Sequence, residues 1–364
     1  MTEQFLHGVQ LVSDTEGTRP VKTVKSSVIG CVLKASKELG PKLIVTKQDV
    51  TDFENAGAEV DALHWIRQQG AAMIVAVGTV DATTAVAADK GLELLKTAES
   101  KVFAEPRIII CPEFSSTAAV ATKMKAVADS LQAVAIIDCP KDSDKAAAKA
   151  YAAANQGSRT FTCWPYVKAS DKDGAEVEAP MAPFVAGLIA KSDNERGFWW
   201  SPSNQDINGI IGLKTAVDFK LGVTDCTANE MNELKITTIV NQSGYKLWGN
   251  RMGDNSFISV LRTKDLINDS LQRAHLWAVD QNLTSNFIES VTGSVNAYLR
   301  HLTALGAILG GECWVDPELN TPEILQQGKV YFDFDFTPPT PAEHITFRSH
   351  LVNTYFANIV GGNE

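Results

Sequence analysis

The sequence lacks the patterns of common metal, membrane and nucleic-acid proteins. Its six cysteines lie far apart, without the C-x-x-C pairs of structural zinc sites. No run of about 18 or more apolar residues occurs, which excludes an ordinary membrane-spanning helix. The first residues lack the basic region and apolar core of a secretory signal. No Lys/Arg run occurs in a chain of net charge −10, so nucleic acid is a poor candidate partner.

The residues that are present predict a folded protein with more than one domain. The chain has 364 residues, of which 45% are hydrophobic and 21% charged. These values are typical of a globular protein, and the length exceeds what one hydrophobic core normally accommodates. Most cysteines lie in apolar, strand-like runs, which favours buried, reduced thiols.

Compact apolar runs alternate with helical patterns between residues 28 and 165. The runs include Val28–Leu33, Ala72–Gly78 and Ala133–Asp138. Because they are continuous rather than alternating with polar residues, they predict parallel strands buried on both faces. We therefore expect an open, doubly wound α/β domain.

The alternation ends after Trp164, and the second half has longer elements. Phe257–Arg262 reads as a strand, followed by long amphipathic helices over Thr263–Gln281 and Thr284–Leu309. In Gly328–Phe336, phenylalanines alternate with polar residues, which predicts a half-buried antiparallel strand. The second half is therefore expected to be an α+β domain.

Catalytic signatures are largely missing. The sequence contains no dinucleotide-binding glycine motif, phosphate-binding loop or nucleophile elbow, and we expect no cofactor. Asp81, Glu113 and Asp138 lie at the ends of predicted strands and could meet at one sheet edge to hold a metal or act as acid and base. The favoured alternative is that such residues cap the following helices. His344 and His350 would share one strand face, but a metal site needs more ligands.

Three motifs occur in a characteristic order. They are the Ser-Pro-Ser-Asn connector at residues 201–204, the turn Trp248-Gly249-Asn250-Arg251 and the segment Pro-Ala-Glu-His-Ile-Thr-Phe at residues 341–347. Together they resemble the contractile tail sheath proteins of P2-like myophages and of phage-tail-like bacteriocins. The resemblance covers nearly the whole chain, although the usual Pro-Gly-Val-Tyr entry is replaced by His-Gly-Val-Gln at residues 7–10.

The resemblance implies a structural subunit and not an enzyme. Such subunits form hexameric rings stacked in a helix around an inner tail tube, and they contract to drive the tube through a bacterial envelope. Implied partners are identical sheath subunits, the tube protein, and baseplate and tail terminator proteins, without nucleic acid or membrane insertion. The implied location is the virion tail, assembled in the host cytoplasm.

The resemblance also implies a division of the chain into an N-terminal arm (residues 1–25), an outer α/β domain with connector (26–240), and a conserved sheath domain ending in a C-terminal arm (241–364). The turn Trp248, Gly249, Asn250 and Arg251 is expected in a domain core. Helix Thr284–Leu309, or the one before it, is a candidate for contact with the tube.

Both chain ends are expected to add strands to neighbouring subunits. The arm Phe5–Val12 has no hairpin partner, and an unpaired edge is a liability unless another strand covers it. The residues expected to pair between subunits are Phe5, Leu6, Gly8, Val9, Leu11, His344, Ile345, Thr346, Phe347, Tyr355 and Ile359. Two alternatives stay open: the sheath of a headless bacteriocin or injection particle, and a cytosolic α/β enzyme using Asp81, Glu113 and Asp138.

Overall fold

The computed structural model describes residues 20–70, 72–80, 85–112, 114–356 and 359. The predicted arm Phe5–Val12 lies outside this part of the chain, as do Asp81 and Glu113. No helix in the described ranges combines the length and apolar character needed to cross a membrane.

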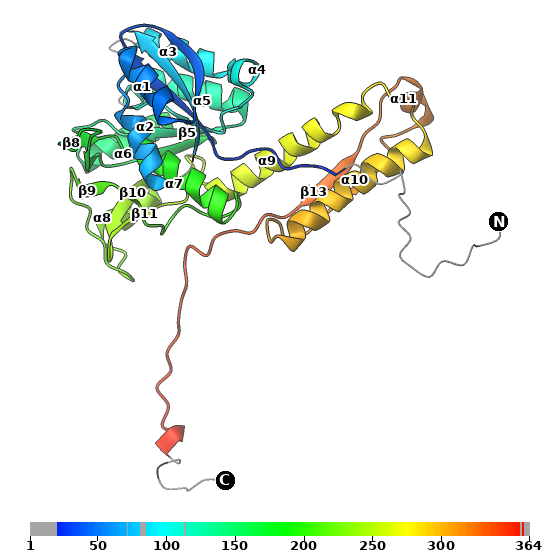
Figure 1. The fold of residues 1–364 in the computed structure, drawn as a ribbon. Coiled ribbons are helices and arrows are strands. Elements are labelled where there is room, and N and C mark those ends of the chain that lie inside the picture. Colours follow the sequence, from blue (N-terminus) through cyan, green and yellow to red (C-terminus); the bar gives the residue numbers. More distant parts are fainter. Residues whose placement is uncertain (1–19, 71, 81–84, 113, 357–358, 360–364) are drawn as a thin grey trace, which may run out of the picture.

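An eight-stranded sheet forms the centre of the larger part of the molecule (Figure 1). Across the sheet the strands are β11 (Tyr245–Trp248), β10 (Ile236–Asn241), β6 (Thr160–Cys163), β5 (Val134–Asp138), β4 (Ile108–Ile110), β1 (Val28–Ala35), β3 (Met73–Val80) and β2 (Leu39–Ile44). Along this order, every neighbouring pair of strands from β10 to β3 is parallel. The two edge strands are antiparallel to their neighbours, β11 to β10 and β2 to β3.

Helices cover both faces of this sheet. Helices α2 (Asp61–Gln69) and α7 (Ala182–Glu195) pack on one face, and α3 (Ala85–Leu95) and α5 (Ala118–Leu131) pack on the other. Along β1, alternate residues belong to the two separate cores, as the pleat of a strand requires. The predicted doubly wound α/β domain is therefore confirmed.

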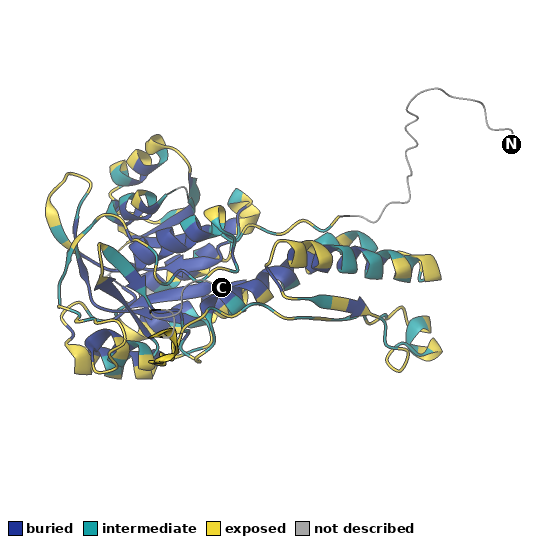
Figure 2. Cartoon of the chain, turned by 90° about the horizontal axis from the view of Figure 1, so that it is seen from below, coloured by how far each residue is buried: buried dark blue, intermediate teal, exposed yellow. Residues whose placement is uncertain are grey.

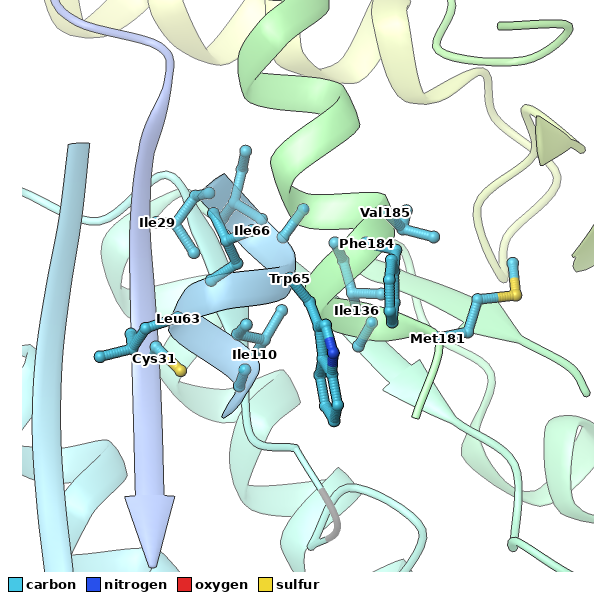
Figure 3. Packing of buried hydrophobic residues seen from close by; sticks show 14 of the residues in the cluster. Ile29, Cys31, Leu63, Trp65, Ile66, Ile110, Ile136, Met181, Phe184 and Val185 are labelled. Carbon is cyan, nitrogen blue, oxygen red and sulfur yellow. The ribbon is translucent and has the colours of Figure 1, made fainter. Parts of the chain in front are cut away.

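The core between α2, α7 and the sheet is closely packed (Figure 3). Trp65 of α2 stacks on Phe184 of α7 with ring centroids 5.4 Å apart. Ile29, Ile66 and Ile136 fill the same core and are fully buried. The remaining helices of the first 240 residues are α1 (Lys47–Asn55), α4 (Ala98–Val102), α6 (Lys145–Asn155) and α8 (Thr227–Glu233).

A small antiparallel sheet occupies the predicted hairpin region near residues 168–178. Its order is β8 (Glu176–Ala179), β7 (Val167–Ser170) and β9 (Ile210–Leu213). Because β9 follows α7 in the chain, this sheet ties the connector after α7 to the α/β domain.

The second half forms a projection from the α/β domain (Figures 1 and 2). It contains the long helices α9 (Ile258–Ala274) and α10 (Ser285–Ala304), with the strand pair β12 (Gly311–Trp314) and β13 (Asp333–Phe336). They share one small core, made by Leu266, Ile267, Leu271, Val295, Tyr298, Leu299, Leu302, Ile308 and Cys313. Shorter elements are η1 (Leu276–Ala278), α11 (Pro322–Gln326) and η2 (Thr354–Phe356). The predicted α+β character is confirmed.

One predicted strand is wrong. Phe257–Arg262 is not a strand, because α9 already begins at Ile258. A run of six residues is too short to distinguish the two periods. Ile258 is buried in the core of the large sheet, and the helix continues from there into the projection.

The strand predicted over Gly328–Phe336 is shorter in the structure, since pairing with β12 covers only Asp333–Phe336. The C-terminal segment that begins at His344 was predicted to be a strand. In its described part, up to Phe356, it pairs with no other strand. A strand needs a partner, and this segment runs away from the rest of the chain (Figure 1). Its pairing with a neighbouring subunit therefore stays a prediction.

Candidate assembly site

The turn Trp248–Arg251 joins the large sheet to the projection. Gly249 has φ +142°, and a Cβ at this position would lie 2.6 Å from Thr237 Oγ1. Glycine is therefore required here both by the backbone conformation and by the close approach to β10. Asn250 is buried, and its carbonyl accepts a hydrogen bond from the N–H of Ile258, the first residue of α9. The turn thus sets the direction in which α9 leaves the sheet.

Arg251 holds the beginning of the C-terminal extension. Its Nη2 donates to Glu343 Oε2 at 2.6 Å, and its Nε donates to Glu343 Oε1 at 3.2 Å. Its Nη1 donates to the carbonyl of Asn255, and its guanidinium lies 3.7 Å from the ring centroid of Phe257. A fork with two bonds to one carboxylate fixes direction as well as distance. The extension therefore leaves the domain along a defined path.

A groove of about 1250 Å³ lies beside this ion pair. Its walls come from the connector after α7, from α8, from the Trp248–Arg251 turn and from residues 339–344 of the extension. Trp200 is half exposed in the groove wall, with the guanidinium of Arg196 at 5.3 Å from its ring centroid. The groove is thus a concave, aromatic and polar surface adjoining the C-terminal extension.

The C-terminal extension presents apolar side chains to solvent. Phe347 is 91% exposed and Leu351 is fully exposed, and Ile345, Tyr355 and Ile359 are also exposed. From His344 to Phe347 polar and apolar residues alternate, so that Thr346 lies between two apolar neighbours. Large apolar side chains exposed in series mark an interaction surface.

The first described residues pack on the projection. The Thr23 hydroxyl lies 2.9 Å from the Tyr298 hydroxyl on α10, and the N–H of Val24 donates to Ser270 Oγ on α9. The side chains of Val21 and Val24 contact the small core. The segment before β1 therefore packs against the projection.

Four charged residues on one face of α9 form ion pairs with the α/β domain. Arg262 pairs with Asp193 of α7, and Asp265 pairs with Arg159 before β6. Asp269 pairs with Arg107 before β4, and Arg273 pairs with Glu99 of α4 and with Glu105. The four residues, which we call the α9 ladder, are spaced by three or four positions and so share a helix face. The ladder fixes the projection to the α/β domain.

Asp138 caps a helix. Its carboxylate is fully buried and accepts hydrogen bonds from the N–H of Ala182, at the start of α7, and from Ser115 Oγ. Burial raises the pKa of Asp138 to about 7, while backbone donors at the start of α7 act in the opposite direction. The helix that Asp138 caps is α7 and not the following helix α6, which Asp144 caps, so the predicted capping of the following helix is wrong for Asp138. Its predicted acidic companions, Asp81 and Glu113, lie outside the described residues.

No group of three or more His, Cys, Asp or Glu side chains within the described ranges could hold a metal ion. His344 and His350 both lie on the exposed extension.

The sequence interpretation missed two features of this surface. Glu343 was part of a motif, but its pairing with Arg251 joins residues 92 positions apart. The α9 ladder left a visible signal, because charged residues at positions 262, 265, 269 and 273 recur at helical spacing. The residues that pair with this ladder could not be predicted from the sequence, because only the fold brings them close to α9.

Comparison with known proteins agrees with this architecture. The family model described as the phage tail sheath protein central domain matches residues 81–251, and that of the phage tail sheath C-terminal domain matches residues 254–351. A prophage major tail sheath protein of Pseudomonas aeruginosa is 35% identical, covering 98% of this chain and 99% of its own length. The tail sheath protein of Escherichia phage P2 is 30% identical, with 98% of each chain covered.

Solved structures share the fold. The helical sheath of the anti-feeding prophage in its contracted state has a TM-score of 0.74 at 20% identity, covering 95% of this chain and 99% of its own. The sheath complex of an extracellular contractile injection system, also contracted, has a TM-score of 0.71 at 17% identity, covering 97% and 99%. On this evidence the chain belongs to the phage tail sheath protein family, as a structural subunit of a contractile tail sheath and not an enzyme.

Proposed function

We propose that this subunit polymerises through its two chain ends into hexameric rings, which stack in a helix around an inner tail tube. The observation that carries this proposal is the extension from His344 to Phe356, whose apolar side chains are exposed and lack a partner strand among the described residues. Strand addition to a neighbour would bury these side chains and satisfy the backbone. A head-to-tail contact of this kind repeats into a helix.

The arms would act as tethers during contraction. Subunits slide and rotate while the arms keep neighbours connected, and additional interface buried in the contracted state supplies the driving force. The α9 ladder supports a subunit whose two parts move together. Contraction then drives the tube through the bacterial envelope.

Further partners follow from the same arrangement. We propose that polar positions of α10 or α9 contact the tube protein, and that the ends of the sheath contact baseplate and tail terminator proteins. The sheath would be assembled in the host cytoplasm and become part of the virion tail, without binding nucleic acid or inserting into a membrane.

We propose three functional parts: an arm over residues 1–25, an outer α/β domain with its connector, and a conserved sheath domain that ends in the C-terminal arm. β11 pairs with β10 in the large sheet, so β11 belongs with the outer α/β domain. The proposed boundary between the outer domain and the conserved sheath domain therefore falls after Arg251 rather than after residue 240.

A headless injection particle is the second candidate. It is favoured by the shared fold with the anti-feeding prophage sheath, whereas the higher identity to the phage P2 protein favours an infectious phage. Particles purified from the producing cells distinguish the two, because a phage carries a DNA-filled head.

Truncation tests the arm mechanism. The chain ending at Pro341, and the chain lacking residues 1–13, should keep the circular dichroism spectrum and melting temperature of the full chain but form no tubes by negative-stain electron microscopy. The reason is that the described residues of the removed C-terminal segment, 342–356 and 359, are all exposed. Normal tubes from either truncated chain would rule out the arm mechanism, and a full chain that stays compact at all concentrations would rule out polymerisation.

A pair of point variants provides a matched control. Phe347 and Phe103 are each 91% exposed, one on the extension and one on the α/β domain. Phe347→Ser should reduce tube formation, whereas Phe103→Ser should leave it unchanged, and neither should alter the melting temperature. Equal effects of the two variants would count against a special role of the extension.

A further inference from the structure

The groove beside the Arg251–Glu343 ion pair has no part in the proposed arm mechanism. Three stretches that lie far apart in the sequence meet in its walls, namely the Ser-Pro-Ser-Asn connector, the Trp248–Arg251 turn and residues 339–344. Its volume of about 1250 Å³ is larger than the roughly 300–1,000 Å³ of most small-molecule sites. A groove of this size accommodates several linked rings.

A strand cannot add to β11 from within the groove. The N–H of Asn204 donates to the carbonyl of Leu247 at 2.7 Å, and the N–H of Leu247 donates to the carbonyl of Gln205 at 3.0 Å. The connector therefore already occupies the edge of β11. A ligand in the groove must be recognised by side chains instead of by a row of backbone groups.

A buried carboxamide in the groove wall lacks a partner. Asn250 is 7% exposed, and its side chain makes no hydrogen bond to any residue that the structure describes. Buried polar groups are normally paired, because leaving them unpaired costs free energy. Neither polar atom of this amide is sealed from solvent, so a ligand can reach both. Asn250 therefore offers a donor and an acceptor side by side.

Three tryptophans add unpaired donors and an aromatic surface. Trp199, Trp200 and Trp248 line the groove, and none of their indole N–H groups donates to a residue in the described ranges. By contrast, Trp65 and Trp164, which lie outside the groove, each donate to a backbone carbonyl. Trp200 is also 51% exposed, so its ring is accessible for stacking.

The charges of the groove are balanced. Apart from His344, its ionisable side chains are Arg196, Arg251, Glu233 and Glu343. Arg251 and Glu343 neutralise each other in their ion pair. A phosphorylated or carboxylated ligand would need a surplus of cations, and a basic ligand would need a surplus of carboxylates. The groove therefore suits an uncharged ligand.

Sugars combine the properties that these side chains require. A sugar ring presents C–H groups that stack on an aromatic face, and each of its hydroxyls both donates and accepts hydrogen bonds. The indole N–H groups and the carboxamide of Asn250 are complementary to such hydroxyls. A polypeptide segment would instead present backbone groups, for which β11 has no free edge here.

We propose that this groove binds an uncharged oligosaccharide, with a sugar ring stacked on Trp200 and sugar hydroxyls bonded to Asn250 and to the indole N–H groups. All of these residues belong to one chain, so the site needs no second copy. It adds a binding activity to the structural role and does not depend on the proposed polymerisation.

Saturation-transfer NMR of the full chain, below the concentration at which tubes form, tests the proposal. The probes are the uncharged maltohexaose, cellohexaose and chitohexaose, and the acidic hexagalacturonate. At least one uncharged probe should bind saturably, and hexagalacturonate should bind at least ~10-fold more weakly than that probe. Trp200→Ala should weaken binding at least ~10-fold, and Asn250→Ala roughly fivefold. Trp314→Ala is the matched control, because Trp314 is 42% exposed on β12 outside the groove, and it should not change the affinity.

Several results would overturn the proposal. They are the absence of saturable binding by every uncharged probe, an unchanged affinity in Trp200→Ala, and hexagalacturonate binding as tightly as the uncharged probes. If no probe binds and Trp200→Ala prevents tube formation, the groove is a contact between copies instead. Melting temperatures identify a variant that fails to fold, and Trp200→Ala decides the matter if Asn250→Ala does so. A chain that binds a probe but forms no tubes would contradict only the proposed function.

Discussion

The α9 ladder includes an ion pair that is almost completely buried. The side chains of Arg262 and Asp193 are 5% and 2% exposed, and two bonds of 2.7 and 2.5 Å join them. Arg262 also donates to the carbonyl of Ser26 at 3.0 Å. One residue pair thus connects α9, α7 and the chain segment that leads into β1.

Removing one partner of this pair should be strongly destabilising. Asp193→Ala leaves the guanidinium of Arg262 buried without a counter-charge, which costs about 3–5 kcal/mol. The comparable surface pair, Lys246 with Asp206, has side chains 23% and 71% exposed. Asp206→Ala should therefore reduce the free energy of unfolding by only about 0–1 kcal/mol.

Urea unfolding followed by circular dichroism, at a concentration too low for polymerisation, measures both values. A third variant, Asp193→Leu with Arg262→Met, removes both charges and should lose less stability than Asp193→Ala alone. Asp193→Ala could instead reduce the free energy of unfolding by no more than about 1 kcal/mol, as expected for Asp206→Ala. The α9 ladder would then be a solvated surface feature that does not hold the projection to the α/β domain.

Three further predictions concern single positions. Because the pKa of Asp138 is about 7 in the folded chain and about 4 when unfolded, the folded state binds the proton more tightly, so stability should fall as pH rises from about 4 to 7. Asp138→Asn should flatten this pH dependence of the melting temperature. Gly249→Ala should lose about 1–3 kcal/mol in thermal unfolding, because the added Cβ meets Thr237 at 2.6 Å and the backbone has φ +142°. Arg251→Gln should change stability by less than about 1 kcal/mol, since Arg251 and Glu343 are partly exposed, but should slow tube formation measured by turbidity.

Each of these has a contradicting result. A melting temperature of Asp138→Asn that follows the same pH slope as the unaltered chain would show that another group titrates. A stable Gly249→Ala would mean that β10 can move away from the turn. Tube formation at the normal rate in Arg251→Gln would show that the direction of the extension does not depend on this ion pair.

The local pattern was sufficient for the α/β domain and misled at the start of α9. The apolar runs at Val28–Leu33 and Ala133–Asp138 became strands of the parallel sheet because burial on both faces leaves a continuous apolar signature. Phe257–Arg262 failed because the packing of Ile258 against the large sheet, together with the long helix that follows, decides its conformation.

The sequence by itself determined the doubly wound layer, the long helices, the sheath resemblance and the alternation of the extension, because all of these depend on residues close together in the chain. The tertiary structure decided which charges meet and how the helices and strands of the projection pack together. Arg107 and Asp269 are 162 positions apart, and the amide of Asn296 reaches β12 only because α10 packs beside it. Contacts between distant residues leave no local period, so only the folded chain could assign them.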